Sequence, residues 1–155
     1  MKIYIAADHA GFYLKKELIK YLEIKGYEVE DCGALTLDPL DDYPDFISKA
    51  AEKVSKDPEN SKAIILGGSG QGEAIVANKF PNVRTAVYYG PPAGGSEEMP
   101  KLTREHNDSN ILSLGARFLS VEKACAAVKL FLDTPFSGDP RHTRRIEKIK
   151  KLEQK

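Results

Sequence analysis

The sequence has no tryptophan, only two cysteines and no long run of apolar residues. No stretch approaches the ~18 consecutive apolar residues of a membrane-spanning helix. The apolar start of the chain reaches Asp8 and His9 too soon for a secretory signal peptide. Cys32 and Cys125 are far apart and form no Cys-x-x-Cys pair, so neither a disulfide framework nor a zinc-ligand spacing is predicted. We therefore expect a cytoplasmic protein with two ordinary thiols.

The chain also lacks net charge, because 23 Lys and Arg residues balance 23 Asp and Glu residues. This balance gives no overall field that would attract a nucleic acid or an anionic membrane, and we expect neither partner. The charge is nevertheless uneven, since residues 141–155 hold seven Lys and Arg residues and two Glu residues. The basic C-terminal segment is therefore the place where an anion would be drawn.

What the chain does have is an alternation of apolar, strand-like runs and amphipathic, helix-like segments over 155 residues, a length typical of one domain. Strands are predicted at 2–7, 27–30, 63–66, 85–88 and 111–114, and helices at 12–25, 45–54, 73–79, 102–106, 121–132 and 144–152. No hairpin signal is present, and parallel strands need crossover connections. The pattern predicts one α/β domain over 1–155, a three-layer, Rossmann-like, doubly wound fold with a five-stranded, mainly parallel sheet flanked by helices.

Polar residues follow three of these strands. Asp8 and His9 follow the first, residues 67–73 the third, and residues 115–117 the fifth. In doubly wound sheets, ligands bind outside the carboxyl ends of the strands. We therefore expect these three segments to meet at one crevice.

Residues 67–72 read Gly-Gly-Ser-Gly-Gln-Gly between a predicted strand and a predicted helix. Such a turn bares backbone N–H groups, which suit a phosphate or a developing oxyanion. The spacing matches neither the dinucleotide-binding, the P-loop nor the serine-esterase motif. Glu73 follows directly, and a carboxylate beside such amides can abstract a proton next to a carbonyl. The alternatives are a tight turn that binds nothing and an acid that merely begins a helix.

The histidines His9, His106 and His142 all stand in polar segments, so we expect at least one to be functional. Metal binding is not predicted, because they are far apart in sequence and have no i,i+4 pairing. Arg141 and Arg145 share a helical face if a helix begins by Arg141, and two guanidinium groups fit one phosphate. The alternative is a solvated, basic helix end.

Together these segments resemble the type B ribose-5-phosphate isomerases and their lactose-pathway relatives, the galactose-6-phosphate isomerase subunits. The resemblance is carried, over nearly the whole chain, by residues 8–11, 42–45, 67–73, 77–79, 104–107 and 141–145. It implies an aldose–ketose isomerase that needs no metal or organic cofactor and moves a proton between C1 and C2 of a sugar phosphate through an enediolate. It also implies a homodimer or a dimer of dimers with active sites between subunits, in which the basic helix at about 143–153 packs on the partner.

Members of this family either carry a cysteine base at the position of Gly67, or have glycine there and a glutamate at the position of Glu73. The chain is similar to the second kind. The resemblance implies four catalytic residues: Glu73 as the base, Ser69 beside the enediolate, His106 as the proton donor that opens the sugar ring, and Asp8 near that ring. It implies three residues that hold the phosphate: His9, Arg141 and Arg145. Further substrate contacts are implied for Tyr43, Gly67, Gly68, Gly70, Gly72, Asn107 and Arg117.

One segment departs from the family pattern. Residues 89–100 are a few residues longer than usual, and their three prolines and three glycines forbid a regular helix. We expect an isomerase of ribose 5-phosphate and ribulose 5-phosphate, and the longer loop leaves a hexose 6-phosphate of the allose or galactose type as an alternative. A non-catalytic, phosphate-sensing α/β domain is a third interpretation, but it would have no use for Glu73 and His106 together.

Overall fold

The computed structural model describes residues 1–91 and 98–153. Its strands are β1 (Lys2–Ala7), β2 (Glu28–Asp31), β3 (Ser61–Gly67), β4 (Thr85–Tyr88) and β5 (Ile111–Gly115). Its helices are α1 (Phe12–Ile24), α2 (Pro44–Lys56), α3 (Gln71–Ala77), α4 (Met99–Asn107), α5 (Val121–Asp133) and α6 (Pro140–Leu152). The strands form one five-stranded sheet in the order β2-β1-β3-β5-β4. Every described strand pair is parallel, so the predicted doubly wound fold is confirmed.

The sequence pattern of each strand matches its place in the sheet. The central strands β3 and β5 are apolar and almost fully buried, because helices cover both of their faces. The edge strand β2 reads Glu-Val-Glu-Asp, and none of its residues is fully buried. Its charges fit an edge that has only one strand partner.

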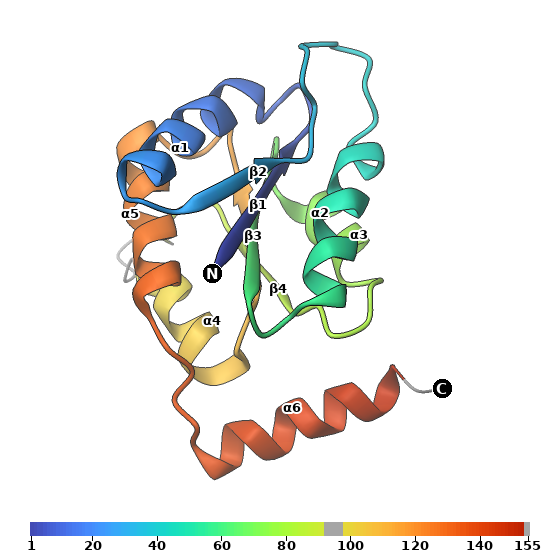
Figure 1. Cartoon of the computed structure of the whole chain (residues 1–155), viewed down its shortest axis with the longest axis vertical. Coiled ribbons are helices and arrows are strands. Elements are labelled where there is room, and N and C mark those ends of the chain that lie inside the picture. The colour runs from blue at the N-terminus through green and yellow to red at the C-terminus, as the bar shows by residue number, and fades with distance from the viewer. Residues whose placement is uncertain (92–97, 154–155) are drawn as a thin grey trace.

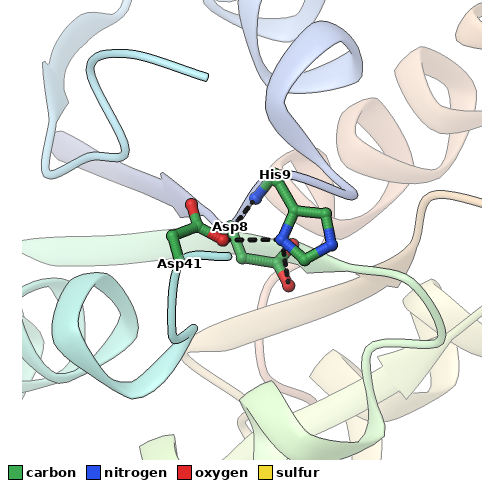
Figure 2. Close-up of side chains that lie close together, drawn as sticks. All are labelled: Asp8, His9 and Asp41. Atoms are coloured by element: carbon green, nitrogen blue, oxygen red, sulfur yellow. Dashed lines mark hydrogen bonds and ion pairs between the residues drawn. The ribbon is translucent and has the colours of Figure 1, made fainter. Parts of the chain in front are cut away.

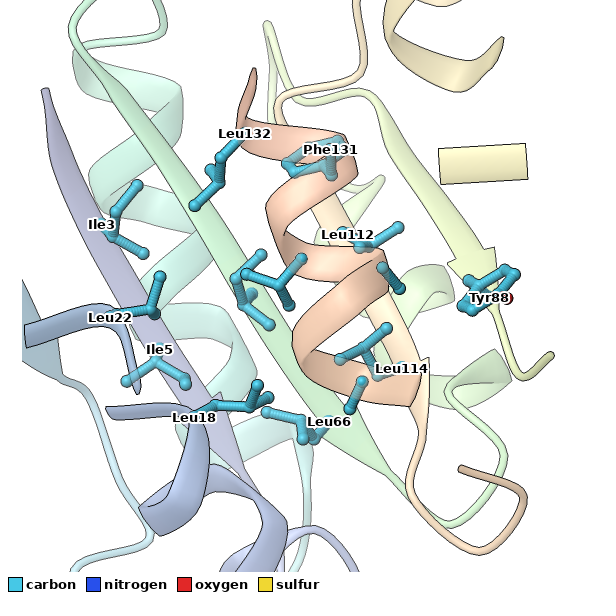
Figure 3. Close-up of a cluster of buried hydrophobic side chains, with 14 of the residues drawn as sticks. Ile3, Ile5, Leu18, Leu22, Leu66, Tyr88, Leu112, Leu114, Phe131 and Leu132 are labelled. Carbon is cyan, nitrogen blue, oxygen red and sulfur yellow. The ribbon is translucent and has the colours of Figure 1, made fainter. Parts of the chain in front are cut away.

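Helices cover both faces of the sheet (Figure 1), and a cluster of buried hydrophobic side chains lies on each face. On one face, Leu18 of α1 and Phe131 of α5 pack with Ile5 of β1 and other buried side chains (Figure 3). On the other face, Ile47 of α2 packs with Ile65 of β3. Alternate strand residues thus serve opposite layers. The result is a rigid frame that brings the carboxyl ends of β1, β3 and β5 to one edge.

Helix α6 stands apart from these layers, below the amino ends of the strands in Figure 1. It begins at Pro140 rather than at the predicted residue 144. Proline is favoured at the first position of a helix, and the Asp139 side chain accepts a hydrogen bond from the Arg141 amide as a cap. His142 is its one buried residue within the described part of the helix.

The predicted helix at 102–106 begins earlier, at Met99, with Pro100 in its first turn. Gly90 has a φ of 109°, which suits the irregular path expected before this helix. Most of the proline- and glycine-rich segment, residues 92–97, lies outside the described residues. Among the described helices, none has the length and apolar character needed to cross a membrane.

Candidate active site

The three polar segments meet at the carboxyl edge of the sheet, as predicted. They enclose a cleft of about 310 Å³. Its walls are Asp8, His9, Ala10, Tyr43, Gly68, Ser69, Gly72, Glu73, Arg117 and Phe118. Two larger grooves, of about 730 and 620 Å³, lie elsewhere on the described surface, but neither contains this combination of a buried acid, a histidine and a glycine-rich turn. We name the smaller hollow the carboxyl-edge cleft.

Glu73 lies in the first turn of α3 and is only 4% exposed. Its carboxylate occupies the space beside Gly67, where a Cβ atom would lie 1.8 Å from Oε1. Any side chain at position 67 would therefore displace the acid. Burial raises the pKa of Glu73, its own backbone amide opposes the shift, and the charge of Asp8 adds to it. A buried carboxyl with a raised pKa beside a cleft can accept and return a proton.

The glycine-rich turn places backbone and side chains close together around Glu73. Gly70 adopts a left-handed φ of 78°, and its carbonyl accepts a hydrogen bond from the Ser113 hydroxyl at 2.7 Å. A Cβ at Gly72 would lie 2.8 Å from the Tyr43 ring, and one at Gly68 would lie 3.1 Å from the Arg117 guanidinium. These close approaches explain the run of glycines. They also place Tyr43 and Arg117 against the turn.

His9 lies between two carboxylates at the end of β1 (Figure 2). Its Nδ1 is 2.6 Å from Asp41 Oδ1 and 3.9 Å from Asp8 Oδ2. The hydrogen bond with Asp41 raises the pKa of His9, desolvation lowers it, and the charges of Asp8 and Asp41 raise it. Arg117 has a smaller, lowering effect. The arrangement favours a positively charged ring that can face an anion.

Asp8, His9 and Asp41 could also be considered as metal ligands, since one ligand atom of each lies within 4.8 Å of the others. Three of the atoms that could bind a metal are, however, already engaged in hydrogen bonds. His9 Nδ1 and Asp41 Oδ1 share a hydrogen bond, and Asp8 Oδ1 accepts from the amides of Ala10 and Gly11. The arrangement fits a hydrogen-bonded cluster better than an open cation site, and the absence of a metal requirement stays a prediction.

Four other predicted residues, His106, Asn107, Arg141 and Arg145, lie at the opposite end of the strands, where the strands begin. His106 and Asn107 end α4 just before β5 begins, and the Asn107 carbonyl accepts a hydrogen bond from Arg84, which precedes β4. Helix α6, which carries Arg141 and Arg145, faces a groove lined by residues that precede β3, β4 and β5. Strand β5 alone spans about 16 Å. One chain therefore does not bring these residues to the carboxyl-edge cleft.

At these amino ends of the strands, the rings of His106 and His142 stack with their centroids 4.4 Å apart. Arg141 Nη2 lies 3.3 Å from His142 Nε2. Burial lowers the pKa of His142, and the nearby His106 and Arg141 lower it further. Arg141 is exposed, as are His106, Asn107 and Arg145. Because Arg141 and Arg145 both lie in α6, the condition for their sharing a helical face is met.

The sequence did not single out Asp41, and it gave His142 no specific role. Asp41 lies in a loop without periodicity, so no pattern indicated its burial or its bond with His9. His142 was visible within the segment 141–145, but only the stacking with His106 gives it a structural role. Neither contact could be inferred from spacing alone.

Comparisons with known proteins agree with this geometry. The family described as Ribose/Galactose Isomerase matches residues 3–149. Ribose-5-phosphate isomerase B of Mycolicibacterium paratuberculosis is 44% identical over 154 residues, covering 99% of this chain and 92% of the relative. The Escherichia coli protein of the same name is 36% identical, with coverage of 99% and 97%.

Solved structures give the same result. Ribose-5-phosphate isomerase B from Mycoplasma genitalium, with bound ribulose-5-phosphate, superposes with a TM-score of 0.92 at 37% identity, covering 99% of this chain and 97% of that one. The Clostridium thermocellum protein gives a TM-score of 0.89 at 41% identity, with coverage of 99% and 98%. With the family match spanning nearly all of the described fold, the chain belongs to the ribose/galactose isomerase family.

Proposed function

We propose that the chain interconverts ribose 5-phosphate and ribulose 5-phosphate, a reaction of the non-oxidative pentose phosphate pathway. The observation that carries this proposal is the buried Glu73 carboxylate beside Gly67, facing the carboxyl-edge cleft with a raised pKa. The relatives described above are ribose-5-phosphate isomerases, and one structural neighbour holds ribulose-5-phosphate. These relatives favour the pentose over the hexose 6-phosphate alternative.

Glu73 acts as the base in this mechanism. It removes the proton from C2 of the open-chain aldose, and the electron pair of that bond forms the C1–C2 double bond of an enediolate. The protonated acid then returns the proton to C1. As the carbonyl forms at C2, the hydroxyl proton of O2 moves to O1. Atoms and electrons balance without an oxidant or a cofactor. A raised pKa suits this task because the same group must hold and release a proton.

The glycine-rich turn stabilises the enediolate. Negative charge develops on O1 and O2, and the backbone amides of the turn from Gly68 to Gly72, together with the Ser69 hydroxyl, supply hydrogen-bond donors beside Glu73. Preorganised donors of this kind lower the barrier because they need no rearrangement as charge develops. Asp8 and Tyr43 line the cleft and contact the sugar.

A second subunit supplies the rest of the site. His106 protonates the ring oxygen, and Asn107, Arg141 and Arg145 bind the sugar and its phosphate, together with His9 and Arg117 from the first subunit. One chain holds the residues of the carboxyl-edge cleft and the residues around His106 at opposite ends of the strands. Each site therefore forms between two copies in a homodimer or a dimer of dimers. The exposure of Ile149 and Leu152 on α6, at 44% and 65%, supports a helix that packs on a partner.

The proposal is tested by assaying the purified protein on ribose 5-phosphate, allose 6-phosphate, galactose 6-phosphate and unphosphorylated ribose, with a chelator present. Turnover of ribose 5-phosphate should be the fastest, and unphosphorylated ribose should be a poor substrate. Preference for a hexose 6-phosphate would replace the pentose assignment. Loss of activity with the chelator, restored by a metal, would contradict the cofactor-free mechanism. Sedimentation should give a dimer or a tetramer, and a monomeric active protein would contradict the shared site.

A further inference from the structure

Asp41 is a buried carboxylate in a loop that is otherwise open to solvent. All residues from 35 to 40 are exposed, yet the side chain of Asp41 is only 6% exposed. Burying a carboxylate costs free energy unless hydrogen bonds or opposite charge compensate. The loop between β2 and α2 thus holds this group at a specific partner, and that partner is His9.

One oxygen of Asp41 binds His9 twice. Oδ1 accepts a hydrogen bond from the His9 backbone N–H at 3.1 Å and another from the ring Nδ1 at 2.6 Å. A carboxylate can only accept, so Nδ1 carries the proton. Oδ2 has no hydrogen-bond partner within the described residues. With both backbone and ring tied to one carboxylate, Nε2 is the ring nitrogen left for a ligand.

Other charged groups around His9 are less suited to this task. Asp8 Oδ2 is 3.9 Å from Nδ1, and Asp8 Oδ1 already accepts from the amides of Ala10 and Gly11. Arg117 repels a charged imidazole, while Glu73 and Tyr43 line the same cleft. The hydrogen bond with Asp41 is the first cause of the raised pKa of His9. Asp41 therefore controls both the direction and the charge of the ring.

We infer that Asp41 is a positioning residue, which holds the His9 ring so that its Nε2–H donates to the phosphate of the substrate. This inference rests on the proposed function, in which His9 contacts that phosphate. A hydrogen bond between a charged imidazole and a phosphate is stronger than a neutral one. Asp41 contributes to it through His9 and does not itself contact the sugar.

The first test is Asp41→Asn, with Asp38→Asn as the matched control. Asp38 lies in the same loop, and its Oδ1 accepts from the Leu40 amide, a bond that asparagine can retain. Asp41→Asn should raise KM for ribose 5-phosphate about ten-fold, because one charge-assisted hydrogen bond to the phosphate is lost. Its kcat should stay close to that of the parent. Asp38→Asn should change neither constant. An unchanged KM in Asp41→Asn would overturn the inference.

The pH profile separates positioning from a general loss of stability. The raised pKa keeps His9 charged above its ordinary value of 6.5, and the variant loses this effect. The KM defect should therefore be largest between 6.5 and the raised pKa of the parent, and should shrink at lower pH, where both proteins carry a charged His9. In a His9→Gln background, Asp41→Asn should cause no further rise in KM. A defect equal at every pH, or additive with His9→Gln, would contradict the inference.

Nitrogen-15 NMR of the imidazole rings tests the contact without any assay of activity. The chain has only three histidines, and His106→Gln and His142→Gln assign the His9 signals. In the parent, neutral His9 should carry its proton on Nδ1, and Asp41→Asn should lower the His9 pKa. A neutral His9 ring in the parent with its single proton on Nε2 instead of Nδ1 would overturn the inference, even if Asp41→Asn failed to fold. If the parent did not isomerise ribose 5-phosphate but showed this tautomer, the proposed function would fail while the Asp41 contact stood.

Discussion

Gly67→Ala is the perturbation whose effect follows most directly from the structure. A Cβ at position 67 would lie 1.8 Å from Glu73 Oε1 and 2.0 Å from its Cδ. To reach even a tight contact of 3.0 Å, the carboxylate must retreat by more than 1 Å. A displacement of about 1 Å at the reacting group can cost about 100-fold in rate. This loss corresponds to roughly 2.7 kcal/mol of transition-state stabilisation.

Steady-state kinetics on ribose 5-phosphate measure the effect, and kcat/KM should fall at least about 100-fold. Gly26→Ala is the control, because Gly26 has a φ of 83° and no atom within 4 Å of an added Cβ. It should lower the melting temperature through backbone strain while preserving kcat. Adding Gly67→Ala to Glu73→Gln should cause little further loss, because the base is already disabled. Parental kcat/KM in Gly67→Ala would refute the assignment of Glu73 as the base.

Four other predictions concern Glu73, His106 and the two cysteines. Glu73→Gln should reduce kcat about 10²- to 10⁴-fold. In the parent, kcat/KM should rise with pH, with a midpoint above pH 4.5, because the base must be ionised and its pKa is raised. The raised pKa also means that ionised Glu73 destabilises the fold, so Glu73→Gln should melt at a higher temperature than the parent at pH 8 and lose this advantage below pH 4.5; a lower melting temperature at pH 8 would contradict the burial argument. His106→Ala should impair turnover of cyclic substrate far more than that of an open-chain analogue, and equal losses would show that His106 does not open the ring. Burial raises the pKa of Cys32 to about 11 and also raises that of Cys125, so alkylation at pH 8 should spare the activity, whereas rapid inactivation prevented by substrate would implicate a thiol.

The sheet and the cleft could be predicted because their sequence signals are local and strong. The apolar residues of β3 indicated a central parallel strand, and the polar residues that follow β1, β3 and β5 indicated the crevice. Glu73 could be picked out because it follows a glycine-rich turn. The structure adds what spacing does not contain, namely that Glu73 fills the space left by Gly67.

The remaining features depend on contacts between distant segments. The start of α6 was predicted too late because the periodic residues begin after the Asp139 cap and Pro140. Asp41 lies in an exposed loop, so its burial depends on where the loop folds back onto His9. Likewise, no local pattern shows that His106 and Arg145 lie at the opposite end of the strands from Glu73, because this separation depends on the direction of the parallel strands.

Mixing two inactive variants tests the central claim most directly. Glu73→Gln removes the base at the carboxyl ends of the strands, and Arg145→Ala weakens the phosphate contact at their amino ends. In a mixed dimer, one site carries both defects and the other combines the intact Glu73 of one chain with the intact Arg145 of its partner. At substrate concentrations below the KM of Arg145→Ala, mixing followed by subunit exchange should restore activity well above that of either variant alone. No recovery after exchange is confirmed would show that each chain holds a complete site, and would contradict the shared-site mechanism.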